Sequence, residues 1–313
     1  MTEVEGSGPI GVVVMAYGTP RSPAEILPYY TDIRRGRPPT DEQLADLTRR
    51  YEAIGGLSPL LERTAAQQHA LQARLDTIAP GRYRVELGLK HAAPSIEDTV
   101  AMLAAAGVDR VVGLVLAPHY SAYSVGQYLD RLGDAAQSHG LLATGVESWA
   151  TEPALVEFLA GEVSDRLAAL PESTRVVFTA HSLPSRIVES GDPYPDQLAA
   201  TAAAVVERVG LDPAAWEIGW QSAGRTPEPW LAPDILEIVD RLANERVNGV
   251  LVCACGFVAD HLEVLYDLDI EARRRAESHD LAFDRTACVN DHPAVMGSLA
   301  RRVDAVSLAA WGS

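Results

Sequence analysis

Short, nearly continuous apolar runs alternate along the chain with longer segments of helical periodicity. The apolar runs, rich in β-branched residues, are those of residues 11–18, 83–91, 110–120, 175–181 and 248–256. Runs of this length without polar alternation are typical of strands buried on both faces of a parallel sheet. Segments such as 62–79 and 95–106 place apolar residues at helical spacing instead. The alternation predicts an α/β fold of parallel sheets flanked by helices.

Two stretches repeat one pattern, which suggests two similar halves. VVVMAYGTP (12–20) and VVFTAHSLP (176–184) each run from a buried strand into Ala, a polar ring, two further residues and Pro. Strand patterning alone is the other explanation of this similarity. The length of 313 residues fits two domains of roughly 150 residues. We therefore predict Rossmann-like domains over 1–160 and 161–313, with a ligand cleft beyond the carboxyl ends of their strands.

The charge balance argues against several classes of function. The chain has 26 Lys and Arg against 43 Asp and Glu residues, a net charge of −17. Because such a chain repels phosphate backbones and anionic lipid, we expect no nucleic-acid partner. No apolar run approaches the roughly 20 residues of a membrane span, so we expect no membrane insertion. Three cysteines and an acidic, glycine-bearing N-terminus indicate a cytoplasmic protein.

An acidic row follows the last apolar run. If residues 256–273 are helical after their first turn, Glu263, Asp267 and Glu271 fall four residues apart on one face. A solvated helix face is the alternative explanation. The row, however, starts beside His261 at a strand-to-helix junction, where carboxylates favour a divalent cation. The sequence therefore favours a metal site here.

His181 ends another buried run and precedes Ser182 and Pro184. A single histidine near a core is more often structural than catalytic. Its place at a carboxyl strand end, with the acidic row expected opposite, favours a functional role. A neutral imidazole beside a carboxylate is a partial site for Fe²⁺ or a similar metal, and the same pair could move protons.

Basic residues gather in the first half of the chain. Five arginines lie between residues 34 and 50, and Tyr51 and Ser58 follow them. A solvated helix end is the alternative explanation. Arginines and hydroxyl groups together suit carboxylate recognition through charge-assisted hydrogen bonds. In a chain of such negative charge, this cluster would give an anionic substrate a place to bind.

Nine blocks of the sequence together resemble the ferrochelatases. They are VVVMAYGTP, YYTDIRRGRPP, RYEAIGGLSPL, GLKHAAPSIEDTV, LAPHYSAYSVGQY, AHSLP, GDPYPDQL, GWQSAGRTPEPWLAPD and GFVADHLEVLYDLDIEA, in family order. The chain is most similar to the soluble bacterial coproporphyrin III ferrochelatases. The resemblance implies two Rossmann-like domains of the class II chelatase fold. It also implies insertion of Fe²⁺ into coproporphyrin III, giving coproheme and two protons in haem biosynthesis.

The resemblance assigns a role to each candidate residue. His181 and Glu263 would bind the iron on one porphyrin face, and Tyr17 would lie axial to the product iron on the other face. Asp267 and Glu271 would form an outer site for a second divalent cation. The residues that would hold the porphyrin and its propionates are Tyr17, Arg34, Arg50, Tyr51, Ser58 and Tyr128.

The sequence departs from part of the family in its cysteines. Some members carry a [2Fe–2S] cluster on four cysteines, usually with three near the C-terminus. This chain has three cysteines, and Cys253 and Cys255 fall on one face of an expected buried strand. Buried structural thiols are the better explanation, so we expect no cluster.

The resemblance also implies the partners of the chain. We expect a monomer that takes a porphyrin substrate, releases coproheme and makes transient contact with neighbouring haem-pathway enzymes. The alternatives are protoporphyrin IX as substrate, a haem- or porphyrin-binding protein without turnover, and a cobaltochelatase-type enzyme of the same fold. The arginine cluster favours the tetracarboxylate coproporphyrin over protoporphyrin.

Overall fold

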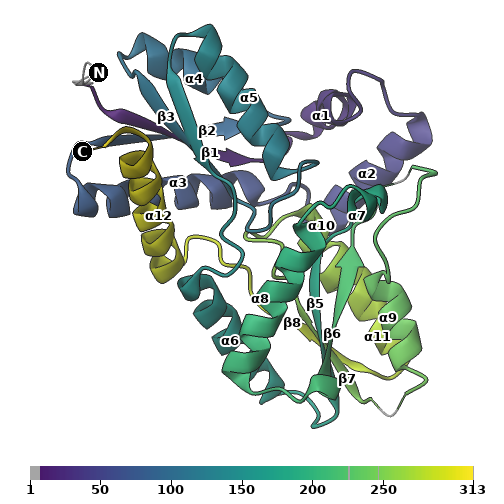
Figure 1. Ribbon diagram of the computed structural model, residues 1–313. Coiled ribbons are helices and arrows are strands. Elements are labelled where there is room, and N and C mark those ends of the chain that lie inside the picture. Colours follow the sequence, from purple (N-terminus) through teal and green to yellow (C-terminus); the bar gives the residue numbers. More distant parts are fainter. Residues whose placement is uncertain (1–7, 225, 246, 313) are drawn as a thin grey trace.

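A computed structural model describes residues 8–224, 226–245 and 247–312, and its strands form two parallel sheets (Figure 1). Within this part of the chain each sheet has four strands. The first, in the order β2-β1-β3-β4, consists of β1 (Ile10–Ala16), β2 (Tyr83–Leu89), β3 (Arg110–Val115) and β4 (Leu142–Val146). The second, in the order β6-β5-β7-β8, consists of β5 (Thr174–His181), β6 (Trp216–Gln221), β7 (Gly249–Cys253) and β8 (Ala282–Arg285). The expected α/β fold with parallel sheets is confirmed.

The two sheets share one order of strands. β1 lies between β2 and β3, and β5 lies between β6 and β7, in parallel pairing throughout. The repeated sequence pattern therefore marks the same interior strand of each sheet. Tyr17 directly follows β1 and His181 is the last residue of β5, so both lie at carboxyl strand ends.

Helices cover both faces of the first sheet. α4 and α5 pack on one face, and α3 contacts β2 on the other. A separate pair, α1 and α2, extends away from the sheet (Figure 1). The helices of this half are η1 (Pro23–Glu25), α1 (Ile26–Ile33), α2 (Asp41–Ala53), α3 (Leu60–Ile78), α4 (Ile96–Ala105) and α5 (Val125–Ser138).

Helices also cover both faces of the second sheet. α6 and α8 pack together against one face, and α9 and α11 lie over the other. The helices that follow α5 are α6 (Pro153–Leu167), α7 (Arg186–Glu189), α8 (Tyr194–Val209), η2 (Pro213–Ala215), α9 (Ile235–Leu242), α10 (Leu262–Leu265), η3 (Asp267–Ala272), α11 (Arg273–Glu277) and α12 (Pro293–Trp311).

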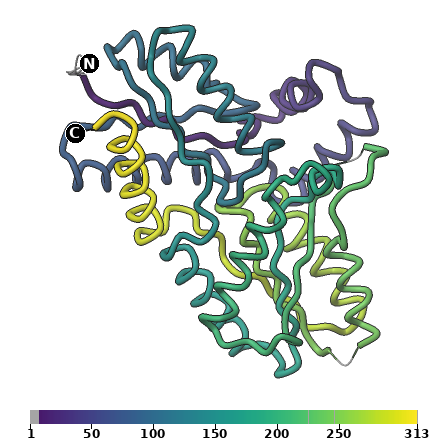
Figure 2. The backbone as a smooth tube through the Cα atoms, viewed as in Figure 1, coloured from purple at the N-terminus to yellow at the C-terminus, as the bar shows by residue number. Residues whose placement is uncertain are grey.

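The last helix returns to the first sheet. α12 packs against α3 and β4, and the chain crosses between the two lobes to reach that place (Figure 2). One core cluster accordingly joins both sheets, with Val14 of β1 and Phe178 of β5 among its members. The domain division at residue 160 stays a prediction, and α12 adds packing that joins the two lobes.

The strand ends differ from the sequence expectation. β3 ends at Val115 instead of residue 120, and β7 ends at Cys253 instead of residue 256. Pro118 has no N–H for a sheet ladder, and the Cys255 N–H turns back onto the Cys253 carbonyl. The apolar character of these segments continues past the strands because the residues stay buried. β4, β6 and β8 were not predicted, since edge strands need no continuous apolar run.

The cysteines and the helices each bear on an expectation from the sequence. Cys253, Cys255 and Cys288 are all buried, as expected of structural thiols. Among the residues that the structure describes, no helix is long and apolar enough to cross a membrane.

Candidate active site

Glu263 lies between two imidazoles at the carboxyl ends of neighbouring strands. His181 ends β5, and Glu263 follows β7 through a loop into α10. The Nε2 atom of His181 is 3.6 Å from Oε1 of Glu263, and the Nε2 atom of His261 is 3.5 Å from Oε2. The adjacency of β5 and β7 thus brings together the pair His181 and Glu263 that the sequence suggested.

Backbone carbonyls fix the orientation of both rings. Nδ1 of His181 is 2.5 Å from the carbonyl oxygen of Ser182, and Nδ1 of His261 is 3.0 Å from that of Ala259. A carbonyl only accepts, so each Nδ1 carries a proton and donates it. Each Nε2 therefore turns toward the Glu263 carboxylate, with a lone pair that can take either a proton or a metal ion.

The ionisation of this group favours cation binding. Burial alone would raise the pKa of Glu263, but the neighbouring His181 and His261 outweigh it and hold that pKa below its ordinary value. Burial alone would lower the pKa of His181, but the Glu263 carboxylate outweighs it and raises that pKa above 6.5. The carboxylate therefore stays ionised, and it favours a positive charge at Nε2 of His181, from either a proton or a metal ion.

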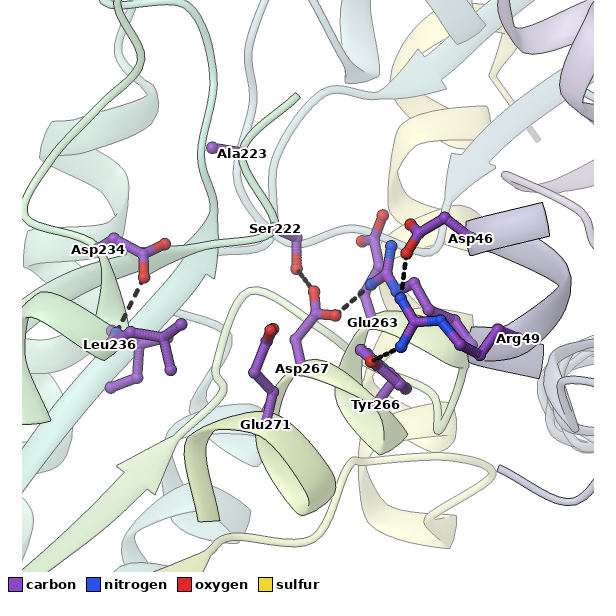
Figure 3. A pocket seen from close by; sticks show the side chains of 12 residues that line it. Asp46, Arg49, Ser222, Ala223, Asp234, Leu236, Glu263, Tyr266, Asp267 and Glu271 are labelled. Atoms are coloured by element: carbon purple, nitrogen blue, oxygen red, sulfur yellow. Dashed lines mark hydrogen bonds and ion pairs between the residues drawn. The ribbon is translucent and has the colours of Figure 1, made fainter. Parts of the chain in front are cut away.

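The acidic row lines a pocket of about 250 Å³ beside this group. Figure 3 shows Glu263, Asp267 and Glu271 around the same cavity, with Ser222 facing Asp267. The expectation that the three carboxylates share one face is thus fulfilled. Within the described residues, no group of three or more His, Cys, Asp or Glu side chains is arranged to hold a metal ion. A bound metal would therefore need further ligands from a substrate or from water.

The expectation of a regular α-helix through this row was wrong. After α10, the segment Asp267–Ala272 forms a π-helix, in which the Glu271 N–H bonds the Tyr266 carbonyl five residues back. Asp267 and Asp269 of this segment face opposite partners. Asp267 faces Arg50 and Ser222, while Asp269 forms a two-point ion pair with Arg285 on the other side. π-Turns of this kind recur at functional sites.

Arg50 from the first half reaches the acidic pocket. Its guanidinium pairs with Asp267 and lies 4.8 Å from the centre of the Tyr266 ring. Burial raises the pKa of Asp267 to about 6, with Arg50 opposing the shift and Glu263 adding to it. The sequence suggested separate basic and acidic regions, whereas the structure joins them at Arg50. The adjacent Arg49 lines the same pocket with a largely exposed side chain, where it pairs with Asp46 and donates to the Tyr266 hydroxyl at 3.3 Å (Figure 3).

The remaining porphyrin residues predicted from the resemblance are dispersed along the first half. Arg34 donates to the Arg37 carbonyl, and Ser58 accepts from the N–H of Leu60 at the start of α3. Tyr51 and Tyr128 are buried, at 2% and 5% exposure. Burial raises the pKa of Tyr51 and of Tyr128, and the Glu263 carboxylate adds to both shifts. Within the described residues no hydrogen bond or ion pair joins these four to the His181 group, so their role stays a prediction.

Tyr17 faces the acidic group from the first sheet. Its side chain is 41% exposed, and its ring packs 4.5 Å from the centre of the His91 ring. Desolvation raises the pKa of Tyr17, and the Glu263 carboxylate adds to that shift. The Tyr17 hydroxyl therefore keeps its proton at neutral pH.

Several residues around the site had no predicted role. His261 was noted only for lying beside the acidic row, although its spacing of two from Glu263 at a helix start was a usable indication. Lys90 lies 4.9 Å from the centre of the Tyr128 ring, and burial lowers its pKa to about 8. The sequence contains no indication that joins Lys90 to Tyr128, because strand and helix packing bring them together.

A glycine lets the loop after β7 approach β5 beside His181. A Cβ on Gly256 would lie 2.4 Å from the Cβ and 2.7 Å from the Cα of Ala180. Gly256→Ala is therefore expected to destabilise the protein by about 1–3 kcal/mol and to lower activity, because Ala180 precedes His181. Denaturant unfolding and initial rates measure both effects.

Gly161 in α6 provides the matched control. An added Cβ there meets nothing within 4 Å. Gly161→Ala should stabilise the protein by about 0.5–1 kcal/mol, as expected of alanine in a helix, and leave the rate unchanged. Equal behaviour of the two variants would contradict the close packing of Gly256 on Ala180.

Comparison with known proteins identifies the family. The family model for ferrochelatase matches residues 9–306. The chain belongs to the ferrochelatase family. Among ferrochelatases, it is 44% identical to the coproporphyrin III ferrochelatase of Geobacillus kaustophilus over 93% of this chain and 93% of that one. It is 43% identical to the coproporphyrin III ferrochelatase of Bacillus subtilis, over 93% and 96%. It is also 41% identical to a ferrochelatase of Herpetosiphon aurantiacus, over 94% and 97%.

Solved chelatases share the fold of this ferrochelatase-family chain. SirB from Bacillus subtilis with Fe³⁺ superposes with a TM-score of 0.58 at 11% identity, covering 96% of this chain and 97% of that one. CbiX, the terminal enzyme of siroheme biosynthesis in denitrifying bacteria, gives 0.54 at 16% identity, over 94% and 98%. The expected class II chelatase fold is confirmed.

Proposed function

We propose that this chain inserts Fe²⁺ into coproporphyrin III, giving coproheme and two protons. The observation that carries the proposal is the Glu263 carboxylate set between Nε2 of His181 and Nε2 of His261 in a chain of the ferrochelatase family. Relatives that are 43% and 44% identical over 93% of the chain bear the name coproporphyrin III ferrochelatase. This supports iron as the metal and coproporphyrin III as the porphyrin.

Insertion of Fe²⁺ into a porphyrin requires a weakly held metal ion and a base near the pyrrole nitrogens. Fe²⁺ must bind the protein and then pass to four pyrrole nitrogens, so a closed protein cage would hinder the transfer. His181 and Glu263 give a partial ligand set that leaves positions open for the porphyrin. When Nε2 of His181 holds neither a proton nor the metal, it can accept a pyrrole proton, and the carboxylates of the acidic pocket give the pyrrole protons a route outward.

The porphyrin would lie between the two lobes, with Tyr17 on one face and His181 on the other. Tyr17 follows β1 and His181 ends β5, at carboxyl ends of the two interior strands. Arg34, Arg50, Tyr51, Ser58 and Tyr128 would hold the ring and its propionates. Arg50 would contact both the porphyrin and the acidic pocket, because its guanidinium already pairs with Asp267.

Asp267 and Glu271, the residues of the predicted outer site, fit a second divalent cation poorly in this conformation. The Asp267 carboxylate is engaged by Arg50 and Ser222, whereas no hydrogen bond or ion pair of the described residues engages the Glu271 side chain. A cation at Asp267 would have to displace the Arg50 guanidinium or lie beside it. We derive no step of the reaction through that cation.

Anaerobic incubation with Fe²⁺ and each porphyrin tests the function. We expect the coproheme spectrum to develop with coproporphyrin III, and insertion into protoporphyrin IX to be slower. A preference for protoporphyrin IX would overturn the substrate. Binding of coproheme without insertion would indicate a carrier, and insertion of Co²⁺ alone would indicate a cobaltochelatase. The monomeric state, the cytoplasmic location, contacts with other haem-pathway enzymes and the lack of a [2Fe–2S] cluster stay predictions.

Metal affinity should rise with pH. The Glu263 carboxylate holds the pKa of His181 above 6.5, and protonated His181 has no lone pair for a metal. The proton therefore competes below that pKa, so the affinity falls as the pH is lowered through it. Co²⁺ titration at a series of pH values should give a midpoint above 6.5. A midpoint below 6.5, or affinity independent of pH, would contradict this account.

A further inference from the structure

A short segment of the second half ties the first half to the backbone of His181. Asp192 accepts hydrogen bonds from the Ser121 hydroxyl at 3.0 Å and from the Ala122 N–H at 2.9 Å, both in the loop after β3. Its other carboxylate oxygen accepts from the N–H of Tyr194 at 3.0 Å. The Tyr194 hydroxyl in turn donates to the His181 carbonyl at 2.9 Å. These hydrogen bonds form a chain that connects Ser121 and Ala122 of the first lobe to the backbone of His181.

The first turns of α8 are fastened to the first lobe at two further points. The Gln197 amide oxygen accepts from the Tyr120 N–H and from the Ser148 hydroxyl, each at 2.7 Å. The Thr201 hydroxyl bonds the Ala150 carbonyl at 2.7 Å and Nε2 of His119 at 2.9 Å. The position of α8 is therefore set by the loops that follow β3 and β4, and Tyr194 moves with α8.

The peptide between His181 and Ser182 controls which nitrogen of His181 is presented. Its own oxygen, the His181 carbonyl, is held by Tyr194, and the Ser182 N–H donates to the Gln221 carbonyl at 2.8 Å. The Ser182 carbonyl accepts the Nδ1 proton of His181. A tilt of this backbone would lengthen that hydrogen bond and loosen the ring, whose Nε2 must face Glu263. Partners of this kind orient metal-binding histidines elsewhere.

The Tyr194 ring and its hydroxyl have separable roles. The ring is buried, at 6% exposure, and lies 5.7 Å from the centre of the Trp220 ring and 6.1 Å from that of His119. Phenylalanine would fill the same space without donating to His181. Burial also raises the pKa of Tyr194, so the hydroxyl stays a donor at any ordinary pH.

We propose that Tyr194, braced by Asp192, is a positioning residue that holds the His181 backbone so that Nε2 of His181 faces Glu263 and the incoming metal. Tyr194 does not touch the reacting atoms. It links the position of the first lobe, fixed through Ser121 and Ala122, to the geometry of the metal ligand. The inference rests on the proposed role of His181 and Glu263 as the metal-binding pair.

Co²⁺ titration of the full chain without porphyrin, followed by its visible absorption, tests the inference. Tyr194→Phe should raise the Kd for Co²⁺ about fivefold, in line with the loss of one hydrogen bond to a ligand backbone. The kcat for Fe²⁺ insertion should fall by a similar factor, with the KM for the porphyrin unchanged. Asp192→Asn, which keeps the side-chain shape, should shift the Kd in the same direction by about twofold.

Tyr83→Phe is the matched control. Tyr83 is 3% exposed, and its hydroxyl bonds Asp304 and Ser307 of α12, which are not part of the site. This variant should lose thermal stability while its Kd for Co²⁺ stays that of the wild type. Equal Kd changes in Tyr83→Phe and Tyr194→Phe would show that the weaker Co²⁺ binding of Tyr194→Phe reflects a general loss of stability. That result would overturn the inference.

The outcomes separate the inference from the proposed function. If the wild type inserts iron and both Tyr194→Phe and Asp192→Asn bind Co²⁺ like the wild type, the inference alone is overturned. If His181→Ala binds Co²⁺ like the wild type, the proposed metal pair is wrong and the inference is overturned with it. Should Tyr194→Phe unfold, the Kd measured for Asp192→Asn decides.

Discussion

Iron insertion is expected to fall at least about 100-fold when His181 is replaced by alanine, the scale on which a positioned acid–base group contributes. His181 supplies Nε2, 3.6 Å from the Glu263 carboxylate, and without it one carboxylate must hold the metal and accept the pyrrole protons. Porphyrin binding should persist, because the residues proposed to hold the porphyrin lie in the first half of the chain. Stopped-flow insertion rates measure the first effect and porphyrin fluorescence titration the second.

His139→Ala is the matched control for this substitution. His139 is exposed at the end of α5, where it caps the helix away from the site. The control should insert iron at the wild-type rate. Normal insertion by His181→Ala would refute the proposed mechanism, whereas loss of porphyrin binding in that variant would mean that His181 also shapes the porphyrin cleft.

Arg50→Ala is expected to weaken both stability and porphyrin binding. The Arg50 and Asp267 side chains are only 19% and 9% exposed, and removal of one partner leaves the other as an uncompensated buried charge. The expected cost is about 3 kcal/mol in the free energy of unfolding, and porphyrin affinity should fall at least about tenfold if Arg50 also binds a propionate. Urea unfolding and fluorescence titration measure the two effects.

The loss of stability should depend on pH in a definite direction. Without Arg50, the pKa of Asp267 should rise further above its present value of about 6, while the unfolded carboxyl titrates near 3.8. Below about pH 6 the folded carboxyl is protonated in both proteins, so the stability that the variant loses relative to the wild type grows as the pH rises from about 6 toward the raised pKa of the variant. Arg49→Ala is the control: its side chain is 64% exposed, and its removal should change stability little at any pH.

Much of the fold could be predicted because buried strands and amphipathic helices have their own sequence periods. The runs at 11–18 and 175–181 correspond to β1 and β5, and the helical segment 62–79 corresponds to α3. The edge strands β4, β6 and β8 were missed because they are only partly buried, and the pattern of apolar residues records burial instead of hydrogen bonding. The edge strand β2 was predicted from the run 83–91. In β4, Leu142 is 55% exposed.

The site could be predicted in part for a different reason. His181 and Glu263 each follow a buried run, and parallel strands bring their carboxyl ends to one edge of a sheet. The contact between Arg50 and Asp267 could not be predicted, since α2 meets α10 through a small cluster of Ile26, Tyr51 and Leu262. Such packing depends on the shapes of both surfaces and leaves no periodic pattern in either segment.

The sequence by itself determined the class of fold, the strand ends that carry chemistry and the residue types that suit a metal and an anionic porphyrin. These properties are local, because hydrophobic periodicity and side-chain chemistry act within a few residues. Only the tertiary structure decided that His261 shares Glu263 with His181, that Arg50 enters the acidic pocket, and that Tyr194 holds the His181 carbonyl. The contact of Arg50 with Asp267 spans 217 residues and depends on how the two lobes pack. The other two contacts depend on how β5, α8 and the loop after β7 pack within the second half, which no local sequence pattern records.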